Sequence, residues 1–139
     1  MLETMSRRKT NKTILVIEDS LTQALCLQTL LEQEGLSVLL AYDGQVGLQM
    51  ARQSHPDAIV LDLEMPLMNG LQVCQQLQNT RDTADIPIIM LTRHDDHEAV
   101  ALGLQLGVIE YIPKDAFADA VLLETLRQMG LIAPRAAET

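Results

Sequence analysis

The sequence predicts an α/β protein built on a doubly wound, five-stranded parallel sheet with helices on both faces. Short apolar runs alternate with longer segments of helical periodicity, and this alternation repeats five times along the chain. The apolar runs are nearly continuous rather than alternating with polar residues, which is typical of strands buried on both faces. Strands and helices in this order form right-handed βαβ units and therefore a parallel sheet.

Each strand is predicted from a run of aliphatic or β-branched residues bounded by turn formers. TILVI is the first run, SVLLAY the second, AIVLD the third, IPIIMLT the fourth and VIEYIP the fifth. Asp43-Gly44 turns the chain out of the second strand. The expected strands are residues 13–17, 37–42, 58–62, 86–92 and 108–113.

Each helix is predicted from its apolar spacing and from residues that start or stop a helix. Ser20, Asn69 and Asp115 are side chains that can cap a helix N-terminus, whereas Gly35 and Gly107 favour a helix end. The expected helices cover residues 20–34, 45–53, 69–79, 95–106 and 115–129. Because no repeat or linker interrupts them, we expect one domain over residues 12–130, between a flexible basic leader (1–11) and a flexible tail (131–139).

Size and charge limit the classes of function. The chain has 139 residues, which is enough for one domain with a proper core. The net charge of −9 disfavours binding to DNA or to an anionic membrane surface. No apolar run has the length of a signal-peptide core or of a membrane span, so a cytoplasmic protein is expected. Cys26 and Cys74 lie beside apolar residues of helical segments, which predicts two buried, reduced thiols.

Charged and hydroxyl side chains gather at the carboxyl ends of the predicted strands, where open parallel sheets bind ligands. Glu18 and Asp19 end the first strand, Asp62 ends the third, Thr92 ends the fourth, and Lys114 follows the fifth. Any one of these acids alone is explained as a cap of a loop or helix. Taken together, the five groups predict a shared site.

Crowded carboxylates repel one another unless a proton or a cation neutralises them. Carboxylate oxygens without nitrogen or sulfur ligands favour Mg²⁺ over zinc. A carboxylate nucleophile, a hydroxyl donor and an ammonium beside such a cation are the groups that phosphoryl transfer requires. The rim of the sheet is therefore a candidate phosphoryl-transfer site.

Four ordered motifs resemble the receiver domain of two-component response regulators. VIEDS is similar to the acidic pair of that family, and IVLDLEMPLMNG is similar to its phosphoacceptor strand and turn. IIMLT is similar to its switch hydroxyl segment, and EYIPK to its aromatic and lysine strand. The resemblance implies a flavodoxin-like strand order of 2-1-3-4-5 and a stand-alone, chemotaxis-regulator-like switch.

The resemblance also implies a role for each residue of the rim. Asp62 is the expected phosphoacceptor, with Thr92 and Lys114 each bonding a phosphoryl oxygen. The expected Mg²⁺ ligands are Glu18 (largely through water), Asp19, Asp62 and the backbone carbonyl of Glu64. Thr92 and Tyr111 are the expected switch pair. The expected partners are a histidine kinase or a phosphotransfer protein, which donates the phosphoryl group, and a downstream protein target.

Two residues depart from the pattern of the family. Asp115 follows Lys114 where the family usually has proline, and the proline here precedes the lysine as Pro113. Arg93 follows the switch hydroxyl where a small residue is usual, so it can shade the phosphoryl group or offer it a second cation. Arg93 and His94 are therefore candidate modulators. Residues 94–97 (HDDH) also have histidines spaced for a metal, although a solvated helix start explains them as well.

Three functions remain open at this level. The first is a single-domain, Mg²⁺-dependent phosphoryl acceptor that is a signalling switch rather than an enzyme, although it assists its own phosphorylation and hydrolysis. The second is a receiver-like scaffold that binds proteins without phosphorylation. The third is a Mg²⁺-dependent phosphohydrolase with Asp62 as nucleophile, but that class places its nucleophile after the first strand.

The expected output surface is formed by the fourth helix, the fifth strand and the last helix. In the fourth helix, Ala99, Leu102, Gly103 and Leu106 recur at core spacing. That spacing leaves Val100 and Leu104 pointing away from the sheet. Exposed aliphatic side chains on this face suggest a partner contact, including a possible homodimer.

Overall fold

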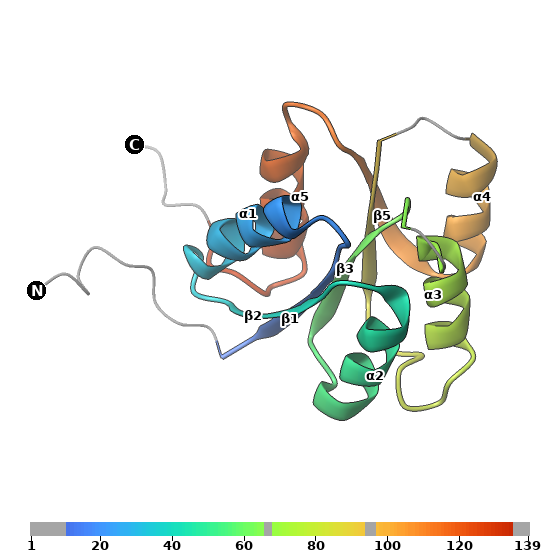
Figure 1. Cartoon of the computed structure of the whole chain (residues 1–139). Helices are drawn as coiled ribbons and strands as arrows, with labels where there is room; N and C mark the ends of the chain where they lie inside the picture. The colour runs from blue at the N-terminus through green and yellow to red at the C-terminus, as the bar shows by residue number, and fades with distance from the viewer. Residues whose placement is uncertain (1–10, 66–67, 94–96, 135–139) are drawn as a thin grey trace, which may run out of the picture.

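The computed structural model describes residues 11–65, 68–93 and 97–134, and it confirms the predicted alternation of strands and helices (Figure 1). The strands are β1 (Thr13–Ile17), β2 (Ser37–Ala41), β3 (Ala58–Asp62), β4 (Ile88–Thr92) and β5 (Val108–Pro113). The helices are α1 (Leu21–Glu32), α2 (Gly44–Ser54), α3 (Gly70–Gln78), α4 (His97–Gln105) and α5 (Ala118–Gln128). The strands pair in parallel in the order β2-β1-β3-β4-β5, as the sequence predicts.

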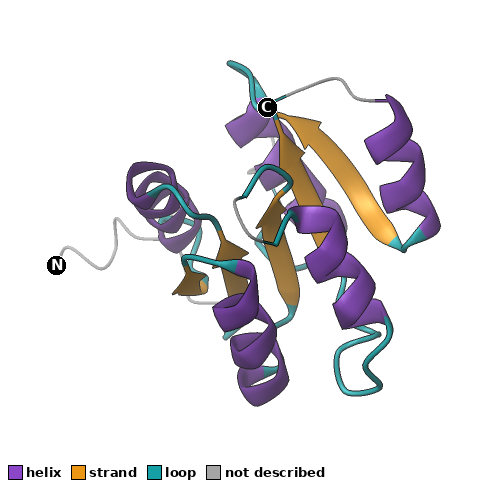
Figure 2. Cartoon of the chain, turned by 45° about the vertical axis from the view of Figure 1, so that its right-hand side comes forward, coloured by secondary structure: helices purple, strands orange, loops and turns teal. Residues whose placement is uncertain are grey.

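Two helices cover one face of the sheet and three cover the other (Figures 1 and 2). On the first face, Ile14 and Val16 of β1 pack with residues of α1 and α5. On the second face, Leu15 and Ile17 of the same strand pack with α2 and α3. Burial on both faces explains why each of β1, β3 and β4 has a continuous run of four apolar residues.

Several element boundaries differ from the prediction. β4 begins at Ile88 rather than at residue 86, since Pro87 has no N–H to donate to the sheet. Asp115 does not cap α5, which begins at Ala118 after Phe117. Its Oδ1 instead accepts a hydrogen bond from the Phe117 backbone N–H at 2.8 Å. Asp115 therefore closes a local turn between Lys114 and the helix.

The predicted burial of Cys26 and of side chains in α4 also needs correction. Cys74 is buried, but Cys26 is exposed because apolar residues surround α1 on all sides and do not define one inner face. In α4, Leu104 is exposed as predicted, but Leu102 is exposed too and Val100 is half-buried. Beyond α5, Leu131 and Ile132 are buried against the α1 and α5 face, so packing continues past the predicted boundary at residue 130.

Candidate functional site

Backbone pairing brings four strand ends to one rim. The backbone N–H of Glu18 donates to the Ala41 carbonyl at 3.0 Å and continues the β1 to β2 ladder. Beyond β5, the Lys114 N–H donates to the Thr92 carbonyl at 2.6 Å. Asp62 and Thr92 are themselves the last residues of their strands. The predicted side chains thus gather because parallel strands end on the same side of the sheet.

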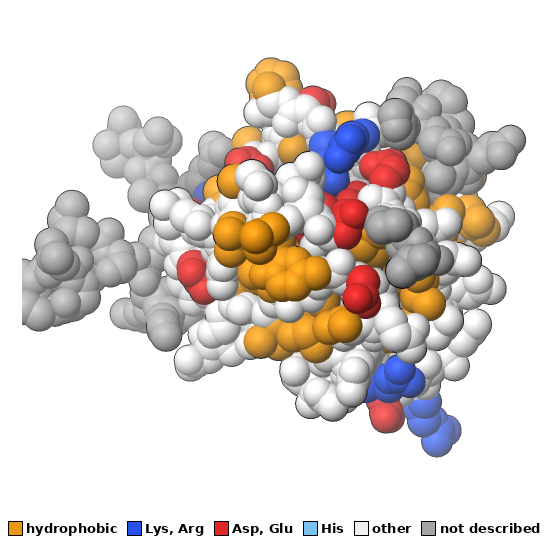
Figure 3. All heavy atoms as spheres, in the orientation of Figure 1, with side chains coloured by type: hydrophobic (Ala, Val, Ile, Leu, Met, Phe, Trp, Pro, Cys, Tyr) orange, Lys and Arg blue, Asp and Glu red, His pale blue; other side chains and the backbone are white. Residues whose placement is uncertain are grey.

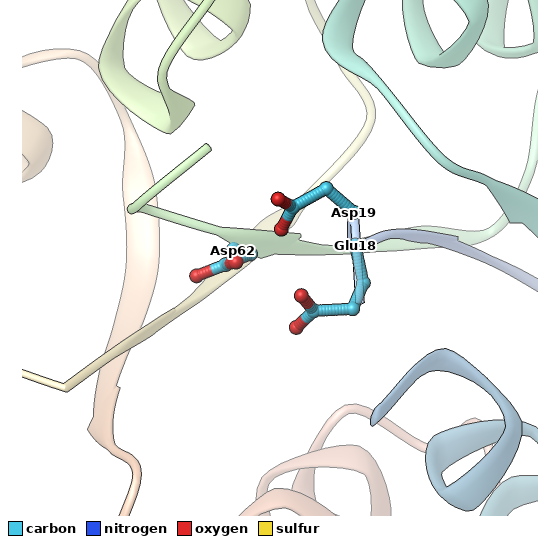
Figure 4. A group of neighbouring side chains, drawn as sticks. All are labelled: Glu18, Asp19 and Asp62. Carbon is cyan, nitrogen blue, oxygen red and sulfur yellow. The ribbon is translucent and has the colours of Figure 1, made fainter. Parts of the chain in front are cut away.

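Three carboxylates form a cluster at this rim. Glu18, Asp19 and Asp62 each place a carboxylate oxygen within 4.8 Å of the others, and Figure 4 shows the three side chains converging from two neighbouring strand ends. Glu18 and Asp62 are buried, whereas Asp19 is exposed. A hard divalent cation fits this donor set, because all three groups offer oxygen and one side remains open to solvent. The predicted grouping of these acids is confirmed.

Lys114, which directly follows β5, supplies positive charge to this cluster. Its Nζ donates to Asp62 Oδ1 at 3.0 Å, to Glu18 Oε1 at 3.2 Å and to Gln23 Oε1 at 2.9 Å. The lysine side chain is 14% exposed, so solvent screens these ion pairs only in part. One ammonium cannot neutralise three carboxylates. The cluster retains an excess of negative charge for a proton or a metal to balance.

The burial of Glu18 and the nearby charge of Asp62 alter the protonation of the Glu18 carboxylate. The pKa of Glu18 is raised from the usual 4.5 to about 7, mainly by burial and then by the hydrogen bond and the negative charge of Asp62. The backbone N–H of Ser20 and the ammonium of Lys114 oppose this change. Without a metal, Glu18 therefore carries a proton over part of the neutral range.

Thr92 is buried at the rim, but its hydroxyl donates to a carboxylate of the chain itself. Thr92 Oγ1 donates to Glu64 Oε2 at 2.8 Å, and the Arg93 backbone N–H donates to Glu64 Oε1 at 3.0 Å. The resemblance to receiver domains implied a backbone role for Glu64 as a metal ligand, and the phosphohydrolase alternative paired Glu64 with Asp62. Its side chain turns toward β4, and it is not part of the acidic cluster formed by the described residues.

The loop after β3 holds Asp62 and Glu64 against the start of α3. The Glu64 N–H donates to Asp62 Oδ1 at 3.1 Å, and the Gly70 N–H donates to the Leu63 carbonyl at 2.9 Å. A Cβ atom on Gly70 would lie 2.7 Å from the Asp62 carbonyl oxygen, which explains the glycine at this position. Asn69 begins α3 with a reciprocal capping box to Gln72. The NG pair of the sequence thus positions the acids of the loop.

The remaining predicted residues lie around the rim. Tyr111 is half-buried in β5, and its ring lies against Gly103 of α4, where a Cβ atom would be 2.5 Å from Tyr111 Cε2. Arg93 is exposed and lines a cleft of about 380 Å³ with Lys114 and Gln23 between α1 and α5. His94 and the start of the HDDH segment lie outside the described residues.

Two contacts at the rim were missed by sequence reasoning, those of Gln23 and of the Glu64 side chain. Gln23 lies in the first turn of α1, so its helical position next to the VIEDS segment was the available signal. Nothing in the spacing shows that Glu64 reaches Thr92, which is 28 residues away along the chain. Figure 3 shows acidic side chains beside a basic one on the face that contains the rim.

A cluster of three carboxylates, a lysine and a buried hydroxyl group thus meet at the carboxyl end of the sheet. Residues 14–127 match the response regulator receiver domain. The chain belongs to this family. Response regulator MprA of Mycobacterium avium is 41% identical over 116 residues, which cover 84% of this chain and 50% of the relative. The chain spans about half the length of the curated relatives it matches.

Solved structures of receiver domains share the fold. Chemotaxis protein CheY4 of Vibrio cholerae superposes with a TM-score of 0.78 at 27% identity, covering 84% of this chain and 97% of that chain. The receiver domain of sensor histidine kinase PA1611 from Pseudomonas aeruginosa has a TM-score of 0.75 at 26% identity and covers 84% of this chain and 95% of its own. That structure holds a magnesium ion in its active site cleft. No described helix of the present chain is both long and apolar enough to cross a membrane.

Proposed function

We propose that this receiver domain is a Mg²⁺-dependent phosphoryl acceptor and that Asp62 takes the phosphoryl group. The observation that supports this most directly is the position of Asp62, which is 2% exposed, within the acidic cluster and bonded to Lys114 at 3.0 Å. A buried carboxylate facing both a lysine and two further acids has the surroundings of a nucleophile rather than of a loop cap.

In the proposed reaction, a carboxylate oxygen of Asp62 attacks the phosphorus of a phosphohistidine on a histidine kinase or phosphotransfer protein. The new P–O bond makes an acyl phosphate, the P–N bond breaks, and the electron pair stays on the imidazole nitrogen. Glu18, Asp19, Asp62 and the Glu64 carbonyl would hold Mg²⁺, which neutralises charge on the phosphoryl oxygens. Lys114 would pair with one phosphoryl oxygen and Thr92 with another. A water molecule later releases inorganic phosphate.

An apolar surface beside the rim supports a protein as the phosphoryl donor. The large exposed apolar side chains of α1, α2 and the loop between β2 and α2 are Leu21, Leu25, Tyr42 and Val46. Figure 3 shows hydrophobic side chains gathered over this region on the face that contains the acidic rim. A donor protein that contacts this patch would bring its phosphohistidine to Asp62.

We further propose that the output surface is the face of α4, β5 and α5, as the sequence suggested. Leu102, Leu104 and Ile109 are exposed there, and a groove of about 370 Å³ between β5 and α5 has Phe117 and Val121 among its walls. The described charged residues that line this groove are Glu110 and Glu124. A basic partner with apolar anchors fits this groove better than a second copy, whose own acids would repel it.

The phosphoacceptor assignment is tested by incubating the protein with acetyl phosphate and Mg²⁺ and measuring the intact mass. We expect the wild type to gain one phosphoryl group, Asp62→Asn to gain none, and the wild type in EDTA to gain none. Asp82→Asn is a matched control, because Asp82 is an exposed aspartate outside the cluster, and it should be labelled as the wild type is. Normal labelling of Asp62→Asn would contradict the assignment, and an unlabelled wild type would favour a scaffold.

A further inference from the structure

Glu64 binds the two donors of β4 as an external anion would. Each of its carboxylate oxygens accepts one hydrogen bond, from the Thr92 hydroxyl at 2.8 Å and from the Arg93 backbone N–H at 3.0 Å. Bonds to an ionised carboxylate are stronger than neutral ones, and two parallel bonds also fix its orientation. The pair of donors therefore forms a small anion site that the chain fills itself.

The same donors are needed by the phosphoryl group of the proposed reaction, and the present inference rests on that function. Thr92 must bond a phosphoryl oxygen, and the neighbouring Arg93 N–H points at the same carboxylate as Thr92 does. Lys114 instead donates to Glu18, Gln23 and Asp62. Glu64 thus competes for the Thr92 side of the site and leaves the lysine side unaffected.

We propose that the Glu64 carboxylate is an internal competitor of the phosphoryl group, which holds the domain in its resting state by occupying the Thr92 hydroxyl and the Arg93 N–H. A phosphoryl group on Asp62 must displace this carboxylate and stay close to its negative charge. Glu64 is half-buried, so after displacement it can reach solvent without leaving a buried charge unpaired. The competition lowers the fraction of the phosphorylated domain that switches.

The inference is tested with beryllofluoride, a phosphoryl mimic, titrated in Mg²⁺ into the full chain and followed by NMR. Removing the competing anion in Glu64→Ala should lower the half-saturating beryllofluoride concentration by roughly tenfold. Glu64→Gln keeps one acceptor oxygen without the charge and should lie between the two, and it replaces the alanine variant if that variant does not fold. Glu32→Ala removes the same charge from the exposed end of α1 and should match the wild type.

A second measurement reports on the contact directly and needs no ligand. The Arg93 amide should exchange its hydrogen faster in Glu64→Ala than in the wild type, because it loses its acceptor. Equal beryllofluoride affinity in Glu64→Ala and the wild type would overturn the inference and leave the phosphoacceptor role intact. If neither protein binds beryllofluoride, both proposals fail together.

Discussion

The two halves of the rim differ in their charge balance and in whether their hydrogen-bond donors have acceptors in the unphosphorylated chain. On the side of β1 and β3, Glu18, Asp19 and Asp62 crowd within 4.8 Å, and one lysine bonds Glu18 and Asp62. On the side of β4, the Thr92 hydroxyl and the Arg93 N–H already have an acceptor in Glu64. The first half is therefore short of positive charge, whereas the donors of the second half are satisfied.

This difference separates the two ligands of the proposed function. A cation entering the first half relieves repulsion that exists in the folded chain, so its binding should be favourable without any rearrangement there. A phosphoryl group entering the second half must break existing hydrogen bonds before it makes its own. The comparison predicts that changes in the acidic half act on metal affinity and on stability. Changes on the β4 side should act on phosphoryl binding and its lifetime.

The largest effect is expected for Asp19→Asn, which acts on the acidic half. This change removes one charged ligand while keeping a side chain of the same shape, and we expect Mg²⁺ affinity to fall by at least about tenfold. Isothermal titration calorimetry on the full chain measures this directly, with Asp82→Asn as the control of equal charge change. Unchanged affinity in Asp19→Asn would remove Asp19 from the ligand set and weaken the contrast between the two halves.

The pKa of Glu18 predicts how stability without metal depends on pH. Because the folded chain holds the Glu18 proton up to about pH 7 and the unfolded chain releases it near 4.5, the folded state binds more protons between these values. The contribution of Glu18 to stability is thus fully present below pH 4.5 and is lost as the pH rises through 7. In EDTA, the urea midpoint should fall from pH 5.5 to pH 8 by more in the wild type than in Glu18→Gln.

Mg²⁺ should reduce the difference between the wild type and Glu18→Gln in how the urea midpoint depends on pH. A metal ligand must be deprotonated, and the cation favours the charged form of the cluster. A wild-type midpoint that changes with pH exactly as that of Glu18→Gln does, with or without Mg²⁺, would show that Glu18 does not hold the extra proton.

Gly103→Ala tests whether the β4 side is coupled to α4 independently of the acidic half. The added Cβ would lie 2.5 Å from Tyr111 Cε2, so the ring must leave its present place at a cost of about 1 kcal/mol or more. We expect altered Tyr111 chemical shifts, altered beryllofluoride-induced changes in α4, and Mg²⁺ affinity within about twofold of the wild type. Ala101→Val enlarges an exposed side chain of the same helix and should leave Tyr111 unaffected.

The proposal that α4, β5 and α5 form the output surface would be wrong if beryllofluoride changed the amide spectrum only at the rim. Under the proposal, the changes spread from Thr92 through Tyr111 to Val100 and Leu104. Val100 is half-buried and Leu104 is exposed, so these two positions report on different depths of α4.

The same contrast explains which features could be predicted from the sequence. The gathering of the acids and the approach of Lys114 follow from residue types at strand ends, since parallel strands bring those ends together. The strand order was implied only by the resemblance to receiver domains. The contact between Glu64 and Thr92 could not be predicted in this way, because it depends on how the loop after β3 turns its side chains toward β4. The exposure of Cys26 was mispredicted for a related reason. Helical spacing defines an inner face only when the other faces are polar, and those of α1 are not.

The smallest expected effect belongs to Arg93→Ala, which separates the side chain of this residue from its backbone. The substitution keeps the N–H that bonds Glu64 and removes only the exposed cation that lines the cleft beside Lys114. If the guanidinium covers the phosphoryl group on Asp62, its loss should admit the attacking water and shorten the lifetime of the phosphoryl group about two- to fivefold, as expected for one exposed charge. Loss of labelled protein over time, measured by intact mass after removal of acetyl phosphate, gives the rate.

Arg93→Lys keeps the charge and should retain most of the wild-type lifetime. Hydrolysis at the wild-type rate in Arg93→Ala would leave Arg93 with a role only through its backbone, and the β4 side would then act on the phosphoryl group through Thr92 and Glu64.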